Sequence, residues 1–354
     1  MGVTGLLEVL GSLGAIWRAF REACRALADP GRRPDLLILI DYPDFNLRLA
    51  GRARRLGVPV LYFISPQVWA WRRGRVRRIA ALVDRMLVIL PFEEEIYRRG
   101  GVPVEFIGHP LLDLVRPGRD RRQVLKPLGL DPRRPTVALL PGSRDNEVSR
   151  LLPPMIGAAR LLREEFADLQ FVLPVAPTLD RGELEAAARR AAQRSRARMR
   201  GGYASARPAR EDPDPAPVLV EEGRYDAVAA SDAAVVASGT ATLETALLGV
   251  PMVIVYKVHP FTYLLARAVS DVPHIGMANL IAGERVVPEL VQGQCRAERI
   301  AAQTRRILVD PAVARRMRLG LRRVRERLGS PGAVDRAARV AWSMIGAGGS
   351  RGDG

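Results

Sequence analysis

A short run of small and hydroxyl-bearing residues, Ser238-Gly239-Thr240, carries the clearest chemical signal in the sequence. The apolar segment 233–237 precedes it, and a helical segment that carries Glu244 follows it. Free backbone N–H groups and the helix dipole make such a strand–turn–helix junction a site for anions. A carboxylate one helical turn further on suits the two hydroxyls of a ribose. Taken alone, the pattern also fits an ordinary tight turn, but it favours a cradle for a nucleotide diphosphate.

A second strand–loop–helix pattern lies earlier in the chain. The β-branched and aliphatic segment 136–140 ends at Pro141-Gly142-Ser143-Arg144, and a helical pattern follows. Arg144 has the side chain whose rigid fork matches two phosphate oxygens at once, and Ser143 adds a hydroxyl. A lone Gly-Ser-Arg is weak evidence. Together with the later cradle in one α/β domain, it indicates a binding site for a phosphorylated ligand.

A third candidate is Asp41, which directly follows the apolar segment 36–40. Open α/β sheets place ligands and chemistry at the carboxyl ends of their strands. A carboxylate flanked there by aromatic residues could be partly desolvated and act as a general base. The residues alone leave two interpretations of Asp41 open, a base and a helix cap. For Asp44 the cap is favoured.

The composition limits the classes of protein to consider. With 354 residues, of which 48% are hydrophobic, the chain can bury a large core, and about two domains are expected. Cys24 and Cys295 stand alone, and the three histidines lack metal-ligand spacing, so we expect no metal and no cofactor. No stretch of 18 apolar residues or signal-peptide pattern occurs, which favours a cytoplasmic location.

The charge is strongly basic, with 55 Lys and Arg against 38 Asp and Glu, a formal net charge of +17. A GC-rich genome explains an arginine bias without any function; the functional alternative is attraction to a polyanion, either nucleic acid or an anionic membrane surface. Basic residues gather at 72–78 and 315–327, the second as a basic amphipathic helix. No nucleic-acid-binding signature accompanies them, so a nucleic acid partner is not expected.

Apolar segments alternate with amphipathic helical patterns along most of the chain, which is typical of parallel α/β sheets covered by helices. We expect an N-terminal domain at 1–115, a nucleotide-binding domain at 116–310, basic helices at 311–345 and a disordered tail at 346–354.

Several sequence blocks occur in an order that resembles one enzyme family. They are Asp41-Tyr-Pro-Asp-Phe-Asn46, Ser65-Pro-Gln-Val-Trp-Ala-Trp-Arg72, Leu90-Pro-Phe-Glu93, Phe106-Ile-Gly-His-Pro110, Leu140-Pro-Gly-Ser-Arg144, Ser238-Gly-Thr-Ala-Thr-Leu-Glu244, Pro260-Phe-Thr262 and Ala278-Asn-Leu-Ile-Ala-Gly283. Together they resemble the lipid-A-disaccharide synthases, two-domain glycosyltransferases of family 19 from Gram-negative bacteria. The resemblance spans about residues 1–310, and the Trp-Ala-Trp block is its most specific part.

This resemblance implies the GT-B fold, with two Rossmann-like, doubly wound parallel-sheet domains that face a cleft. It also implies a metal-free, inverting reaction. UDP-2,3-diacylglucosamine and 2,3-diacylglucosamine 1-phosphate (lipid X) would give a β-1,6-linked disaccharide 1-phosphate and UDP. The substrates are phosphate-bearing lipids, so an anionic inner-membrane surface is the expected partner. A homodimer is also implied.

The resemblance further implies a role for each candidate residue. Asp41 would deprotonate the acceptor 6-hydroxyl, and Arg144 would stabilise the leaving UDP. Glu244 would hold the ribose, and Asn279 would contact the donor or help to close the cleft. Ser143, Ser238, Gly239 and Thr240 complete the expected UDP site. Candidates for an acyl groove are Phe45, Val68, Trp69, Trp71 and Phe261. His109 is expected to be a turn residue.

One departure from the family pattern concerns the start of the chain. Family members carry roughly sixty further residues before the point that matches Met1, including a strand and a glycine-containing loop, and without them sheet edges would be unpaired. The N-terminal domain is therefore expected to be truncated, and a start codon assigned too far downstream is the favoured explanation. The alternatives are an inactive lipid-binding remnant of the fold and another GT-B enzyme such as a UDP-N-acetylglucosamine 2-epimerase.

Overall fold

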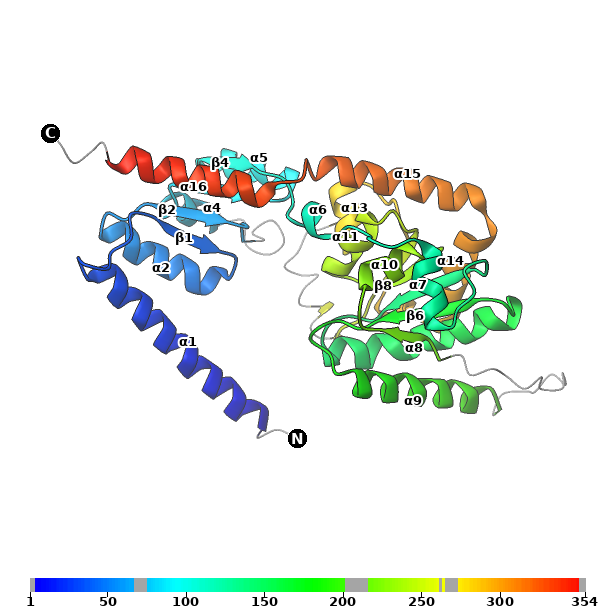
Figure 1. Ribbon diagram of the computed structural model, residues 1–354. Coiled ribbons are helices and arrows are strands. Elements are labelled where there is room, and N and C mark those ends of the chain that lie inside the picture. The colour runs from blue at the N-terminus through cyan, green and yellow to red at the C-terminus, as the bar shows by residue number, and fades with distance from the viewer. Residues whose placement is uncertain (1–3, 67–74, 201–215, 261–262, 265–272, 350–354) are drawn as a thin grey trace. The chain divides into compact units, whose positions relative to one another are not determined.

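The computed structural model describes residues 4–66, 75–200, 216–260, 263–264 and 273–349 (Figure 1). The chain divides into two compact units. The first unit takes the residues up to Pro110 together with those from Leu328 onward, and the second comprises Leu111–Arg327. Each unit has its own parallel sheet and its own hydrophobic core, so each is described by itself.

The first unit contains a four-stranded parallel sheet in the order β1-β2-β3-β4. Its strands are β1 (Leu37–Ile40), β2 (Val60–Phe63), β3 (Arg85–Val88) and β4 (Val104–Phe106). The helices before and between them are α1 (Thr4–Ala28), α2 (Pro43–Arg55), α4 (Arg75–Ala80) and α5 (Pro91–Arg99). Tyr62, Met86 and Ile79 are fully buried in the core that the sheet shares with these helices.

Local sequence explains where these helices begin and end. Both α2 and α5 start with proline, whose fixed φ and missing N–H suit the first helical position. Helix α5 has Glu93 and Glu94 in its first turn and Arg98 and Arg99 in its last, a distribution that complements the helix dipole. Arg98 also pairs with Glu94 one turn earlier, at 2.8 Å.

The last helix, α16 (Ala333–Gly349), packs against the first unit. Its Ala337 and Ala341 share a buried cluster with Leu61, Leu87 and Ile107 of that unit. Arg336 Nε donates a hydrogen bond of 2.8 Å to the carbonyl of Ile107. Helix α16 includes residues 346–349 of the tail that was predicted to be disordered, and residues 350–354 of that tail lie outside the described residues.

The second unit contains a six-stranded parallel sheet in the order β10-β9-β8-β5-β6-β7. Its strands are β5 (Thr136–Leu140), β6 (Gln170–Pro174), β7 (Val218–Val220), β8 (Ala233–Ala237), β9 (Met252–Tyr256) and β10 (Glu289–Val291). Its helices are α6 (Leu111–Leu114), α7 (Arg121–Leu125), α8 (Asp145–Glu165), α9 (Arg181–Arg200), α10 (Arg224–Ala229), α11 (Thr240–Leu247), α13 (Met277–Ala282), α14 (Ala297–Val309) and α15 (Pro311–Arg327), with short 3-10 turns at Lys126–Leu128 and Gln292–Gln294.

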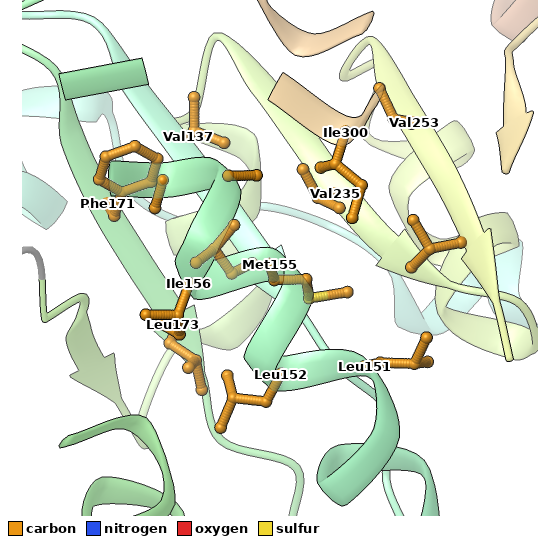
Figure 2. Close-up of a cluster of buried hydrophobic side chains, with 14 of the residues drawn as sticks. Val137, Leu151, Leu152, Met155, Ile156, Phe171, Leu173, Val235, Val253 and Ile300 are labelled. Atoms are coloured by element: carbon orange, nitrogen blue, oxygen red, sulfur yellow. The ribbon is translucent and has the colours of Figure 1, made fainter. Parts of the chain in front are cut away.

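Helices cover both faces of this sheet. Helix α8 contacts α9 and α14 on one face, while α11 and α13 contact α15 on the other. Figure 2 shows the first of these interfaces, where Leu152, Met155 and Ile156 of α8 pack beside Phe171 and other strand residues. Strands buried on both faces explain why their sequences are continuous apolar runs. Among the residues that the structure describes, no helix is both long and apolar enough to cross a membrane.

His109 lies directly after the left-handed Gly108 (φ 80°) and is buried, with 8% of its surface exposed. Its backbone N–H donates to the carbonyl of Leu328 at 3.0 Å, which joins the two chain segments of the first unit. Burial lowers the pKa of its imidazole to about 4. The ring therefore stays neutral at physiological pH, as expected for a residue that shapes a turn.

This lowered pKa predicts an acid-sensitive fold. As the pH falls from 6.5 toward 4, the unfolded chain takes up a proton at His109 that the folded chain does not, so stability decreases. The pKa difference corresponds to on the order of 3 kcal/mol. We expect the melting temperature of His109→Gln to depend less on pH in this window than that of the wild type. If the melting temperatures of the variant and the wild type fell by the same amount between pH 7 and pH 4, the prediction would be contradicted.

Candidate functional site

The second unit has a pocket at the carboxyl ends of β5, β6 and β8, with a volume of ≈ 420 Å³. From β5 the chain continues to β6 and β7 on one side, then returns to place β8 on the other side of β5. This reversal of strand order separates the two following loops and leaves a crevice, the usual ligand site of an open α/β sheet. Ser143, Arg144, Ser238, Gly239, Thr240 and Glu244 all line it.

The loop after β5 is held in shape by Glu147 of α8. Glu147 Oε2 accepts from the backbone N–H of Ser143 at 3.1 Å, and Oε1 accepts from Arg144 Nη1 at 3.2 Å. Gly142 has φ 120°, and a Cβ atom there would overlap the Glu147 side chain. Thr178 Oγ1 donates to the carbonyl of Ser143 at 2.6 Å. The loop thus presents the Arg144 side chain, which is 76% exposed, at the pocket.

The turn after β8 has the predicted strand–turn–helix form. Gly239 precedes α11 with φ 153°, and no described residue accepts a hydrogen bond from its N–H or from that of Thr240. The Ser238 side chain is already engaged, because its hydroxyl donates to the carbonyl of Ile275 at 2.9 Å. The backbone of this turn, rather than the serine hydroxyl, therefore offers donors to an anion.

Glu244 belongs to a cluster with two residues that sequence reasoning missed. Tyr225 Oη donates to Glu244 Oε1 at 2.9 Å, and Arg224 Nη2 donates to Tyr225 Oη at 2.8 Å. The Arg224 guanidinium also lies 4.7 Å from the centre of the Tyr225 ring. Burial and the neighbouring Glu244 raise the pKa of the Tyr225 phenol, so it remains a donor to the carboxylate. Both residues line the pocket and supply an aromatic face and a second cation.

Asn279 does not line the pocket; it is fully buried on α13. Its amide nitrogen donates to Glu289 Oε1 at 2.8 Å and to the carbonyl of Val287 at 2.9 Å. Its oxygen accepts from the backbone N–H groups of Val286 and Val287 at 2.9 and 3.0 Å. All hydrogen-bonding positions of the amide are thus used within the protein, which suits a residue that supports the neighbouring loop.

Asp41 and Phe45 belong to the first unit. Asp41 follows β1 with its side chain exposed, and Phe45 is half-buried, 5.4 Å from the Phe20 ring. The other candidates for an acyl groove, Val68, Trp69, Trp71 and Phe261, lie outside the described residues. Within the described residues, no cluster of three or more His, Cys, Asp or Glu could hold a metal ion.

Comparison with known proteins decides the family. The model of the lipid-A-disaccharide synthetase family matches residues 1–199 and 204–333. A lipid-A-disaccharide synthase of Geobacter sulfurreducens is 47% identical, over 98% of this chain and 84% of that protein. The chain belongs to the lipid-A-disaccharide synthase family. The resemblance read from the sequence blocks is confirmed, and with it the glycosyltransferase class and a role in lipid A biosynthesis.

Solved structures support the same fold at much lower identity. A UDP-N-acetylglucosamine 2-epimerase described as putative, from Listeria monocytogenes, has a TM-score of 0.55 at 12% identity and covers 86% of this chain and 73% of that one. A UDP-forming trehalose-phosphate synthase of Burkholderia vietnamiensis has a TM-score of 0.53 at 17% identity, over 95% and 76% of the two chains. These likenesses confirm the predicted GT-B class of fold. The family assignment favours the synthase over the epimerase and the inactive remnant.

The loop after β5 provides a test of the pocket in this family member. Gly142→Ala forces a side chain into a left-handed backbone and against Glu147, so we expect UDP affinity to fall about tenfold or more, about 1.4 kcal/mol. Gly293→Ala is the matched control, because a Cβ there meets open space. Isothermal titration with UDP measures both. Equal affinity in the two variants would show that the loop does not form the nucleotide site.

Proposed function

We propose that this chain transfers 2,3-diacylglucosamine from UDP to 2,3-diacylglucosamine 1-phosphate. The products are a β-1,6-linked disaccharide 1-phosphate and UDP. The observation that carries the proposal is the pocket of the second unit, which gathers Arg144, the Gly239–Thr240 backbone and Glu244 at a topological switch point in a chain of the synthase family. This combination suits a nucleotide diphosphate as leaving group.

In this proposal the second unit binds the donor. The diphosphate lies against the backbone N–H groups of Gly239 and Thr240, and the Arg144 fork neutralises the charge that develops as UDP leaves. Glu244 accepts from the ribose hydroxyls, and Tyr225 and Arg224 keep its carboxylate in place. Asn279 has an indirect role outside the pocket. It donates to Glu289, which accepts from the backbone N–H groups of Ile275 and Gly276. The carbonyl of Ile275 in turn accepts from the Ser238 hydroxyl.

The first unit supplies the acceptor side. Asp41 takes the proton from the acceptor 6-hydroxyl while that oxygen attacks the anomeric carbon on the face opposite the diphosphate. The bond between the anomeric carbon and the phosphate oxygen breaks, so the configuration inverts and UDP carries away the electron pair. Phe45, together with Val68, Trp69, Trp71 and Phe261, is proposed to contact the acyl chains. The homodimer implied by the family resemblance stays a prediction.

Substitution of the proposed base tests these roles. Asp41→Asn keeps the shape of the side chain and removes its ability to accept the proton, so kcat should fall by about 100-fold or more, because general bases contribute roughly 10²–10⁴. UDP affinity should be unchanged, because the pocket of the second unit is intact. Arg144→Ala should lower both kcat and UDP affinity. Turnover by Asp41→Asn within a few-fold of the wild type would remove Asp41 as the base.

We propose further that the protein works at the cytoplasmic face of the inner membrane, as a peripheral protein on anionic lipid. The support is a groove of ≈ 700 Å³ in the first unit, lined by residues of α1, α2 and α4 or adjoining them. Its apolar side chains include Phe20, Leu47 and Leu82, and it is also lined by five arginines, Arg48, Arg52, Arg54, Arg55 and Arg78. No carboxylate lines it, and only Arg54 pairs with a described acidic residue, Asp84, at 3.3 Å. Such a group of arginines complements phosphate head groups.

The groove predicts a charge-dependent affinity for vesicles. Arg48→Glu with Arg52→Glu should weaken binding to phosphatidylglycerol vesicles by about 30-fold or more, because each basic residue near an anionic surface contributes about 1 kcal/mol and about 1.4 kcal/mol corresponds to tenfold. The matched control is Arg190→Glu with Arg194→Glu, two exposed residues of α9 that give the same change in net charge. Cosedimentation measures both. Equal losses would indicate that net charge, not the groove, determines binding.

A further inference from the structure

Two adjacent strands of the first unit end in backbone conformations that only glycine adopts easily. Asp41 and Tyr42 follow β1 with φ 48° and 39°, and Ile64 follows β2 with φ 64°. The register pairs Ile40 with Phe63, so these residues are neighbours at one edge of the sheet. Gln292 is the only other described non-glycine residue with a positive φ. Non-glycine residues are uncommon in this region, bulky or β-branched ones such as Tyr42 and Ile64 are strained there, and such strain gathers at functional sites.

A pair of buried side chains holds the Asp41 peptide in this conformation. The carbonyl of Asp41 accepts from Asn46 Nδ2 at 2.7 Å and from Tyr62 Oη at 2.5 Å. Asn46 Nδ2 also donates to the carbonyl of Ile40 at 3.0 Å. Asn46 is 8% exposed and Tyr62 is fully buried, so water does not readily replace either side chain as the hydrogen-bond donor. We call Asn46 and Tyr62 the clamp.

The clamp acts on the backbone and leaves the carboxylate available. The Asp41 N–H donates to the carbonyl of Phe63 at 3.2 Å, so the backbone of this residue is hydrogen-bonded at both its N–H and its carbonyl. No described residue forms a hydrogen bond or ion pair with the Asp41 carboxylate, and the side chain is exposed. A fixed backbone with a free side chain is what a positioned base requires, because an error of about 1 Å in placement can reduce a rate by roughly 100-fold.

The two donors suit this task for different reasons. Asn46 lies in the first turn of α2, where its own N–H donates to the carbonyl of Tyr42 at 3.1 Å, so the helix fixes its side chain relative to the strained pair. Tyr62 lies in the central part of the sheet, and burial raises the pKa of its phenol. The phenol therefore remains protonated, and a donor, throughout the pH range in which the protein would work.

We propose that Asn46 and Tyr62 are positioning residues, which hold Asp41 in its left-handed conformation and so direct its carboxylate toward the acceptor hydroxyl. The inference rests on the proposed role of Asp41 as the base. Without the clamp the Asp41–Tyr42 pair can relax to a negative φ, which swings the carboxylate away from the acceptor while the pocket for UDP in the second unit stays unchanged.

The test compares Asn46→Ala and Tyr62→Phe with the wild type. Each should lower kcat by about 10- to 100-fold, with UDP affinity unchanged and the chain folded by circular dichroism. Tyr62→Phe keeps the ring in the core and removes one hydroxyl, so it remains informative if Asn46→Ala unfolds. The control is Ser231→Ala, which removes a buried hydrogen bond from a side chain to the carbonyl of Ala227 in the second unit and should leave kcat unchanged.

A double-substitution cycle separates positioning from general support of the fold. In an Asp41→Ala background the base is absent, so adding Tyr62→Phe should produce no further loss of the residual rate. The proposed clamp would be overturned if Tyr62→Phe lowered the rate by the same factor in the wild-type and Asp41→Ala backgrounds. It would also be overturned if the wild type were active and both Asn46→Ala and Tyr62→Phe left kcat unchanged. A wild-type rate that does not depend on Asp41 would instead remove the proposed base, so the two failures are distinguishable.

Discussion

At the carboxyl end of every strand of a parallel sheet the chain leaves the hydrogen-bonded ladder. The backbone N–H and C=O groups that follow then have no hydrogen-bond partner on a neighbouring strand. At two of these strand ends, side chains satisfy part of the backbone. In the first unit Asn46 and Tyr62 donate to the carbonyl of Asp41 after β1, and in the second Glu147 accepts from the backbone N–H of Ser143 after β5. Asp41 and Arg144, the residues to which we assign chemistry, follow these strands with exposed side chains, although Arg144 also pairs with Glu147 at 3.2 Å.

In the second unit a buried carboxylate, that of Glu289, also fixes a loop that does not line the pocket. Glu289 is 7% exposed and accepts from the N–H groups of Ile275 and Gly276 and from the Asn279 amide, at 3.1, 2.9 and 2.8 Å. A Cβ at Gly276 would overlap Ile254, so the loop passes close against β9. Three donors compensate the burial of one carboxylate and fix the loop that receives the Ser238 hydroxyl. The geometry of the pocket therefore depends on residues that do not line it.

Sequence reasoning identified the parts of the site that depend on local order. The strands 136–140 and 233–237 and the turns after them follow from apolar runs ended by small residues, and they form β5, β8 and two walls of the pocket. Tyr225 and Arg224 were missed because only the fold brings them to Glu244, across 19 residues for Tyr225. No periodic pattern records such a contact.

Asn279 shows a different limit. Its residue type and its place in a family block suggested a contact with the donor or a role in closing the cleft, but residue type does not reveal whether an amide is engaged by the backbone. The packing of α16 on the first unit is a similar case, because the contact between Arg336 and Ile107 joins residues more than two hundred positions apart. Long-range packing decides both cases.

The most direct test of the account is to identify the products formed by the wild-type chain from UDP-2,3-diacylglucosamine and 2,3-diacylglucosamine 1-phosphate. Mass spectrometry would quantify UDP and the glycolipid, and NMR would assign the new linkage. The account predicts equal amounts of UDP and a β-1,6-linked disaccharide 1-phosphate, formed only when both substrates are present. Consumption of the UDP-sugar at the same rate without the acceptor, or an epimerised UDP-sugar as the product, would contradict it.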